Sequence, residues 1–400
     1  MLALAVSAIA AGWLSDQARC LIVNNDGFSD FFSGYLSDQE SIDRYVEKYA
    51  DTKVGILEWC INGSRVNYRS TVAELIGHGC MEFPRRGDQR AVEAYRRLAE
   101  QGTDLLAAVA DACHKKANIE CFASIRAACE YPTGWMGELL PRMFNASIWW
   151  THPEWRVRGP RGEDWTKLSY AVPQVMSFKL ALVREVLERD IDGINIDFLR
   201  HPPFVGYEQP VAEEFQRRHG QPLEGVPSSD PRLQQIWCDV MTRFMHGVRE
   251  LARQAAERRG RPVRVSVRID HSHGRDWGLD VERWCAERLI DILEIGQHSL
   301  GGYDMGLRPF VKMAHANGVL VYASEEAVLS GHDLTPEEDK AIAEGKMKPP
   351  ERDVMTRDMY FDRAKRWYEQ GADGVHIFND PHNFDVFRAW PCPPEGGAGR

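Results

Sequence analysis

The sequence predicts a (β/α)8 barrel, and three observations lead to this prediction. Short apolar segments alternate with amphipathic ones along the whole chain, as a parallel sheet with crossover helices requires. Eight of the apolar segments have the length of strands. Gly260, Gly318 and Gly371 each stand just before an expected strand, where a preceding helix needs a left-handed cap.

The expected strands follow from the short apolar runs and cover, in order, residues 19–24, 53–60, 118–125, 193–199, 262–270, 290–297, 319–324 and 373–379. The expected helices follow from amphipathic spacing and cover 41–50, 104–116, 172–188, 233–257, 281–288, 309–317 and 353–370. Long polar segments follow the second, third and fourth strands. In a barrel these loops build the site, and a further insertion at 331–351 is expected to cover one rim.

The chain of 400 residues, 44% of them hydrophobic, is large enough for one catalytic domain at 19–390. Residues 1–18 are expected to be a signal remnant or a capping segment, and 391–400 a flexible tail. The apolar, small-residue start predicts export to the periplasm or medium, with a cytoplasmic location as the alternative. Nine cysteines without a CxxC pair argue against zinc and leave room for one or two disulfides.

The net charge of −10, with acids and bases interspersed, argues against a nucleic-acid partner or an anionic membrane surface. No later segment approaches eighteen uninterrupted apolar residues, so no membrane span is expected. No phosphate-binding glycine loop is present, and we expect no cofactor. The sequence leaves open whether the protein forms a homodimer.

The fourth strand carries the most informative polar pattern. Alternation places Ile194 and Ile196 on one face and Asn195 and Asp197 on the other. The strand is followed by Arg200 and His201. In a (β/α)8 barrel the carboxyl ends of all strands converge on one pocket. The other expected strand ends deliver Asn24, Asn25, Asp26, Glu58, Arg126, Arg268, Asp270, Glu294, Gln297, His298, Glu325, Glu326, His376 and Asn379.

Carboxylates, amides and arginines together with loop tryptophans are typical of a carbohydrate pocket, since aromatic faces stack on sugar rings and glycosidic cleavage needs an acid and a second group. Simpler interpretations stay open. Asp197 and Arg200 could form a rim ion pair, and Glu58 and Glu294 could be buried partners of arginines. The Asp270–His273 segment is a weak metal pattern, so no metal site is expected. The tryptophans, which could equally be packing residues, are Trp135, Trp149, Trp150, Trp155 and Trp277.

Residues 192–202, Asp-Gly-Ile-Asn-Ile-Asp-Phe-Leu-Arg-His-Pro, resemble the strand-four signature of family-10-like glycosyl hydrolases. Matches at 24–27, 122–126, 152–155, 168–173 and 371–379 extend the resemblance over most of the chain. The sequence is more closely similar to glycoside hydrolase family 156, inverting exo-sialidases on a (β/α)8 barrel.

This resemblance implies that Arg126 and Arg200 bind the carboxylate of sialic acid, that Asn379 contacts the ligand and that Asp26 is catalytic. Guanidinium forks bind a carboxylate bidentately. The family has a catalytic histidine a few residues beyond the strand-three arginine, whereas this sequence reads Ala-Ala-Cys-Glu-Tyr-Pro at 127–132. Glu130, Tyr131 or His201 are the candidates to replace it.

The leading hypothesis is an O-glycoside hydrolase that removes a terminal acidic sugar from a carbohydrate substrate. Asp26 and Asp197 are the expected catalytic carboxylates, with Glu130 or His201 as proton carriers. The expected substrate-binding residues are Asn25, Glu58, Arg126, Arg200, Asp270, Gln297, His298, Glu325 and Asn379.

If Asp197 and Glu325 face each other, a separation of ~5 Å would favour retention of configuration and ~6.5–9.5 Å inversion. One alternative is a hydrolase of neutral or uronic-acid polysaccharide in which Arg200 serves Asp197. The other is a sugar-binding barrel without catalysis.

Overall fold

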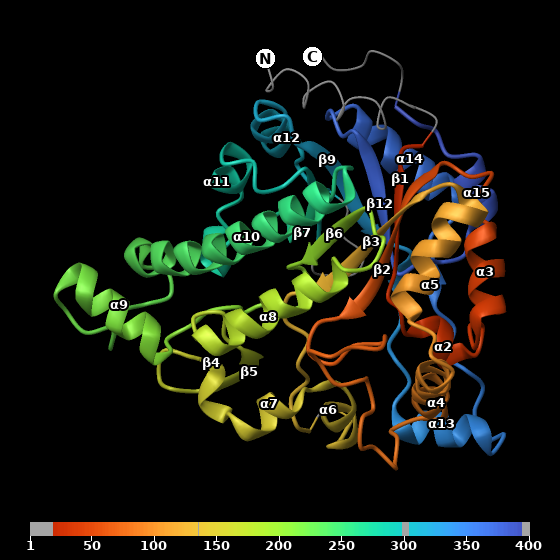
Figure 1. The fold of residues 1–400 in the computed structure, drawn as a ribbon, viewed down its shortest axis with the longest axis horizontal. Coiled ribbons are helices and arrows are strands. Elements are labelled where there is room, and N and C mark those ends of the chain that lie inside the picture. The colour runs from red at the N-terminus through yellow and green to blue at the C-terminus, as the bar shows by residue number, and fades with distance from the viewer. Residues whose placement is uncertain (1–18, 135, 298–303, 394–400) are drawn as a thin grey trace.

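The computed structural model of the chain describes residues 19–134, 136–297 and 304–393. Eight parallel strands close into a barrel in the order β1-β12-β9-β8-β7-β6-β3-β2 (Figure 1). The predicted (β/α)8 barrel is confirmed, and each strand begins and ends within two residues of its expected bounds. The strands are β1 (Leu21–Asn25), β2 (Val54–Asn62), β3 (Glu120–Arg126), β6 (Gly193–Asp197), β7 (Arg264–Asp270), β8 (Ile292–Gly296), β9 (Leu320–Glu326) and β12 (Gly374–Phe378).

Helices surround the barrel, and each expected helix has a counterpart. These are α3 (Gln39–Glu47), α5 (Leu105–Ala112), α8 (Pro173–Val186), α10 (Pro231–Arg259), α11 (Val281–Ala286), α12 (Arg308–His315) and α14 (Arg357–Tyr368). Helix α5 continues into a π-helical turn, and α14 begins later than expected because Asp353–Val354 forms β11, which pairs with β10 (Val328–Ser330). The side chain of Thr356 then caps α14 by accepting a hydrogen bond from the amide of Met359.

Further elements extend the loops after the strands. They are α2 (Ser29–Ser33), α4 (Arg86–Glu100), α6 (Leu139–Phe144), α7 (Ser147–Thr151), β4 (Arg156–Arg158), β5 (Asp164–Leu168), α9 (Gln209–His219), α13 (Pro336–Ala343) and α15 (Phe384–Arg388). Figure 1 shows α4, α6, α7 and α13 gathered at one end of the barrel. They follow the carboxyl ends of their strands, so this end is the expected site of function. The insertion at 331–351 contains α13 and lies at this end, as expected.

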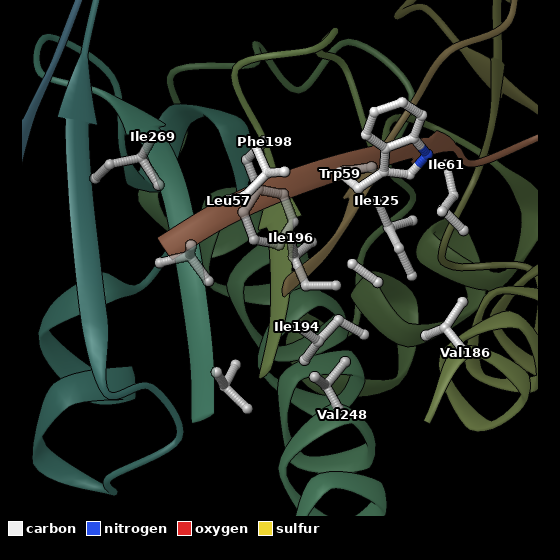
Figure 2. Packing of buried hydrophobic residues seen from close by; sticks show 14 of the residues in the cluster. Leu57, Trp59, Ile61, Ile125, Val186, Ile194, Ile196, Phe198, Val248 and Ile269 are labelled. Carbon is white, nitrogen blue, oxygen red and sulfur yellow. The ribbon is translucent and has the colours of Figure 1, made fainter. Parts of the chain in front are cut away.

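The main hydrophobic core lies between the barrel and the helices. Ile194 and Ile196 of β6 belong to it, and Figure 2 shows Ile194 next to Val248 of α10. Asn195 and Asp197 alternate with these residues and point into the barrel, where Asn195 bonds to side chains of other strands. The predicted division of these four residues between the two faces of the strand is therefore confirmed.

The floor of the barrel interior is mostly apolar and is packed around two large rings, with the guanidinium of Arg264 5.3 Å from the centre of the Phe122 ring. Ile22, Ile56, Phe122, Ile292 and Tyr322 form this second cluster. Two strands contribute glycine to the same layer for a steric reason. A Cβ at Gly193 would lie 2.5 Å from the Phe122 ring, and one at Gly374 would lie 2.3 Å from the Tyr322 ring.

A disulfide joins Cys20, just before β1, to Cys392, after α15. The other seven cysteines are reduced and buried. Of the expected tail at 391–400, only residues up to 393 are described, and Cys392 ties that portion to the barrel. The expected segment at 1–18 lies outside the described residues. Within the described ranges, no helix is long and apolar enough to cross a membrane.

Candidate active site

Side chains at the carboxyl ends of the strands line the top of the barrel interior. Every second side chain of a barrel strand points inward, so the inward-facing side chains form successive layers: the floor, a middle layer and this top layer. We call it the mouth layer, and it consists of Asp26, Cys60, Arg126, Asp197, Arg268, Glu326 and Phe378. Three carboxylates and three arginines, counting Arg200 from the loop after β6, therefore meet at the site that barrel enzymes use.

Asp197 is bound by Arg268 of the neighbouring strand. Nε of Arg268 donates to Oδ1 of Asp197 at 2.9 Å, and Nη2 donates to Oδ2 at 3.1 Å. Both side chains are about 2% exposed. The amide of Leu199 donates to Oδ1 as well. Because both oxygens accept hydrogen bonds from one guanidinium, the side chain of Asp197 is held in one orientation.

Arg200 pairs with Glu326 rather than with Asp197, at 3.0 Å between Nη2 and Oε1. The guanidinium also lies 4.7 Å from the centre of the Phe378 ring, while that of Arg268 lies 3.6 Å from it. The ring of Phe378 thus makes a cation–π contact with each of the two arginines. The alternative interpretation, a rim ion pair between Asp197 and Arg200, is wrong, since Asp197 pairs with Arg268 and Arg200 with Glu326.

Arg126 is the arginine of the mouth layer that stays available. Its side chain donates no hydrogen bond within the described part of the chain, and its Nε is buried without a partner. Burial alone would lower the pKa of Arg126, but neighbouring groups that include Cys60, Tyr131 and Asp26 raise it. A guanidinium that makes no hydrogen bond to a described carboxylate is suited to bind an anion.

Asp26 is fixed at the start of α2. Its Oδ1 accepts hydrogen bonds from the amides of Phe28 and Ser29 at 2.8 and 2.7 Å, and its Oδ2 accepts one from the Ser29 hydroxyl at 2.6 Å. This Asx turn explains why the chain reverses direction after β1. It also orients the carboxylate at the rim of the mouth layer, where Asp26 contributes to the field at Arg126.

Asn25 and Glu325 point away from the mouth, so the expectation that they bind substrate there is wrong. Asn25 donates to Asp30 at 2.7 Å and to Tyr45 at 2.9 Å, on the helix side of β1. Glu325 is fully buried and faces Arg363 of α14, with Nη1 and Oε2 3.4 Å apart. Each residue directly follows an inward-facing residue of its strand, so its own side chain points to the opposite face.

The expected proton carriers occupy different places. Glu130 is buried beside Lys179 of α8, with 3.8 Å between Nζ and Oε1, and the ammonium of Lys167 donates to its backbone carbonyl. Neither of these lysines belongs to the mouth layer. His201 follows Arg200, and its amide donates to the carbonyl of Ala128 at 2.5 Å, which ties the loop after β6 to the loop after β3.

Glu58 lies one layer below the mouth and is inaccessible to solvent, so the expectation that it contacts substrate is wrong. Its carboxylate contacts Asn24 at 3.3 Å, Ser266 at 3.2 Å and Nε2 of His376 at 3.2 Å. Burial raises the pKa of Glu58 to about 7 and lowers the pKa of His376 to about 4. Burial and the charge of Glu58 raise the pKa of Glu294, which lies in the same layer.

Asp270, Asn379 and Gln297 follow or end their strands at the mouth end of the barrel. Asp270 follows Arg268 on the interior face of β7, is buried and accepts hydrogen bonds from the amide and hydroxyl of Ser272. Asn379 follows β12 with a positive φ of 53°, and its Oδ1 is buried and accepts no hydrogen bond from a described residue. Gln297 is half-buried after β8. His298 lies outside the described residues.

The loop tryptophans take three different environments. Trp149 is buried, with the guanidinium of Arg156 3.6 Å from its ring centre. Trp150 is 39% exposed. Trp155 and Trp277 each stack on a histidine, His152 and His273, at 3.8 and 4.1 Å between ring centres. Trp135 lies outside the described residues, so Trp150 is the described loop tryptophan with the most surface for a sugar ring.

Arg268 and Glu326 are the site residues missing from the predicted set. Both stand at strand ends noted in the sequence, but the expected assignments gave their positions to Arg200 and Glu325. Counting alternate residues would have found them. Arg268 lies two positions after Ser266 on β7, and Glu326 lies two positions after Ser324 on β9. Both serines face the barrel interior, so the two later residues face it as well.

No family model matches the sequence, and no curated protein matches it. Solved structures do match. The glycoside hydrolase domain of PgaB (BpsB) from Bordetella bronchiseptica is 12% identical, with 92% of this chain and 95% of that chain covered and a TM-score of 0.58. A β-galactosidase from Rahnella sp. R3 is 10% identical, with 91% and 51% covered and a TM-score of 0.52. At these identities the similarity shows the barrel fold alone.

Proposed function

We propose that this protein is a glycoside hydrolase whose substrate presents an acidic sugar to the mouth layer. The observation that carries the proposal is the free guanidinium of Arg126, which lies in a layer that also contains Asp26 and Asp197. An anionic group bound there would bring the adjoining glycosidic bond to two fixed carboxylates. The residue similarity to exo-sialidases of family 156 supports sialic acid as the first substrate to test.

The two aspartates have different tasks in this proposal. A developing oxocarbenium ion is positively charged, and a carboxylate stabilises it, attacks it or activates water. Asp26 and Asp197 suit these tasks because all their oxygens accept hydrogen bonds, which favours the ionised form of each carboxyl group and fixes its orientation. The proton for the leaving oxygen must come from another group, and we assign it to His201 on the loop after β6.

A second candidate is a hydrolase of neutral or uronic-acid polysaccharide. It is favoured by the pairing of two of the three mouth arginines, Arg200 with Glu326 and Arg268 with Asp197, which leaves a single cation for substrate. The exposed ring of Trp150 on the insertion after β3 could support a longer glycan. A sugar-binding barrel without catalysis is the third candidate.

Export is part of the proposal. The disulfide between Cys20 and Cys392 supports it, because such bonds persist in oxidising compartments and are rare in the cytosol. Fold analogy gives weak support to the glycosidase activity in this proposal, since solved structures with this fold include a glycoside hydrolase domain and a β-galactosidase.

The test is hydrolysis of aryl glycosides of sialic acid, glucuronic acid, galactose, glucose and fucose. The wild type is assayed beside Asp26→Asn, Asp197→Asn and the control Asp385→Asn, whose carboxylate is 99% exposed on α15. Turnover restricted to the acidic glycosides, lost in the first two variants and kept in the control, would support the proposal. Turnover of neutral glycosides would favour the polysaccharide hydrolase, and saturable binding without any turnover would favour the third candidate.

A further inference from the structure

The middle layer of the barrel interior is polar on every strand. It consists of Asn24, Glu58, Ser124, Asn195, Ser266, Glu294, Ser324 and His376. Branched apolar residues usually fill barrel interiors. Buried polar groups destabilise a fold unless they have partners, so a complete polar layer calls for an explanation.

Three of these side chains converge inside the barrel from three strands, no two of which are adjacent. Nε2 of His376 on β12 lies 3.2 Å from Oε2 of Glu58 on β2 and 3.6 Å from Oε2 of Glu294 on β8. The three ligand-type atoms lie within 4.8 Å of one another, and all three side chains are 0% exposed. They sit directly below the Asp197–Arg268 pair.

The two distances from Nε2 of His376, 3.2 and 3.6 Å, are close to the ligand–ligand distances of a metal coordination shell. Zinc binds histidine nitrogen and carboxylate oxygen at about 2.0–2.2 Å, so tetrahedral ligand atoms lie roughly 3.3–3.6 Å apart. Ser324 contacts Nδ1 of His376 at 2.8 Å, which orients Nε2 towards the two carboxylates as an outer-shell partner does at metal sites.

Unpartnered atoms provide a second, independent observation. Oε1 of Glu294 and Oδ1 of Asn24 are buried and accept no hydrogen bond from any described residue. Asn24 is a neighbour of this group, because its Nδ2 donates to Glu58 at 3.3 Å. No lysine or arginine of the described chain hydrogen-bonds to Glu58, Glu294 or His376 to balance the two carboxylates.

We propose that Glu58, Glu294 and His376 bind one divalent first-row metal ion, zinc or manganese, with Asn24 as a candidate fourth ligand. Two carboxylates and an imidazole are a ligand set that these ions accept. One divalent ion neutralises both carboxylates and joins β2, β8 and β12 below the mouth layer. This inference does not depend on the proposed glycosidase activity.

The experiment measures metal content and metal-dependent stability of the full chain, purified without a histidine tag from medium supplemented with zinc or with manganese. The variants are Glu294→Gln and His376→Gln. The matched control is Glu325→Gln, which alters another fully buried glutamate that faces α14 instead of the interior. We expect about one bound ion in the wild type and the control, and at least a fivefold loss in both variants. Dialysis against a chelator should lower the unfolding temperature of the wild type and the control.

Cobalt substitution keeps the inference falsifiable if a variant does not fold. Wild-type protein produced with Co²⁺ should show visible absorption bands that Zn²⁺ bleaches on exchange. Less than a tenth of an ion per chain with every metal, or equal metal content in the control and both variants, would overturn the inference. In that case the two glutamates share a proton instead.

Discussion

Arg268 binds both carboxylate oxygens of Asp197, at 2.9 and 3.1 Å, in a pair that solvent hardly reaches. The pair joins β7 to β6 and fixes one of the two aspartates proposed to be catalytic. The ring of Phe378 lies against the same guanidinium. Asp197 therefore owes its orientation to a strand that follows it by some seventy residues in the sequence.

Replacing Arg268 with alanine should destabilise the protein strongly. The change leaves the Asp197 carboxylate buried without its partner, and such losses cost about 3–5 kcal/mol. Urea unfolding measures the difference. Arg388→Ala is the control, because its partner Asp51 is exposed, and it should change stability by about 1 kcal/mol or less. Equal effects of the two substitutions would contradict the importance assigned to the buried pair.

Removing the Arg126 side chain should affect acidic substrates selectively. Arg126 has no hydrogen-bonded partner among the described residues, so Arg126→Ala should leave stability nearly unchanged. A lost charge-assisted contact of about 1.5–3 kcal/mol should reduce kcat/KM on an acidic glycoside roughly 10- to 150-fold. Neutral glycosides and the exposed control Arg161→Ala should show little change. Equal losses on both substrate classes would remove the reason for an acidic-sugar pocket.

Glu326→Gln should release Arg200 for substrate. In the wild type these side chains lie 3.0 Å apart, and Glu326 competes with any anionic ligand for the guanidinium. We expect roughly tenfold tighter binding of a free acidic sugar, from one additional charge-assisted contact. Isothermal titration measures it. The gain should vanish in the double variant Glu326→Gln/Arg200→Ala, and a gain that persists there would show that Arg200 is not the group released.

Stability should fall as the pH rises towards 8. Burial raises the pKa of Glu325 to about 8, although Arg363 acts in the opposite direction. The folded protein therefore holds a proton that the unfolded chain releases above its ordinary pKa of 4.5, and stability is lost between these two values at up to roughly 1.4 kcal/mol per pH unit.

Glu325→Gln should flatten this slope, as measured by urea unfolding at intervals from pH 5 to pH 9. Asp88 and Asp380, whose pKa values are raised by burial, act in the same direction and remain in the variant, so part of the slope should persist. An unchanged slope would mean that the Arg363 pair keeps Glu325 ionised.

Breaking the Cys20–Cys392 disulfide should lower stability by about 2–4 kcal/mol, since the bond closes nearly the whole chain and restricts its unfolded state. Cys20→Ser/Cys392→Ser is compared with the wild type by thermal unfolding. A reductant should bring the wild type to the level of the double variant. If the reductant lowered the stability of the double variant equally, the effect would have another origin.

The sequence alone determined the barrel, the order and approximate bounds of its strands and the placement of Ile194 and Asp197 on opposite faces of one strand. These depend on local properties, namely apolar run length, helix caps and the two-residue repeat of a strand. The sequence also predicted that Asp26 and Arg126 lie at the same end of the barrel, because the carboxyl ends of all its parallel strands meet there.

Only the tertiary structure decided which polar residues share a site. In a parallel barrel both faces of a strand are buried, so polarity does not reveal which face points inward, and Glu325 exchanged places with Glu326 in the prediction. The pairing of Arg268 with Asp197, and the meeting of Glu58 with His376, depend on barrel closure and strand register. These bring together residues far apart in the chain, and no local pattern in the sequence encodes them.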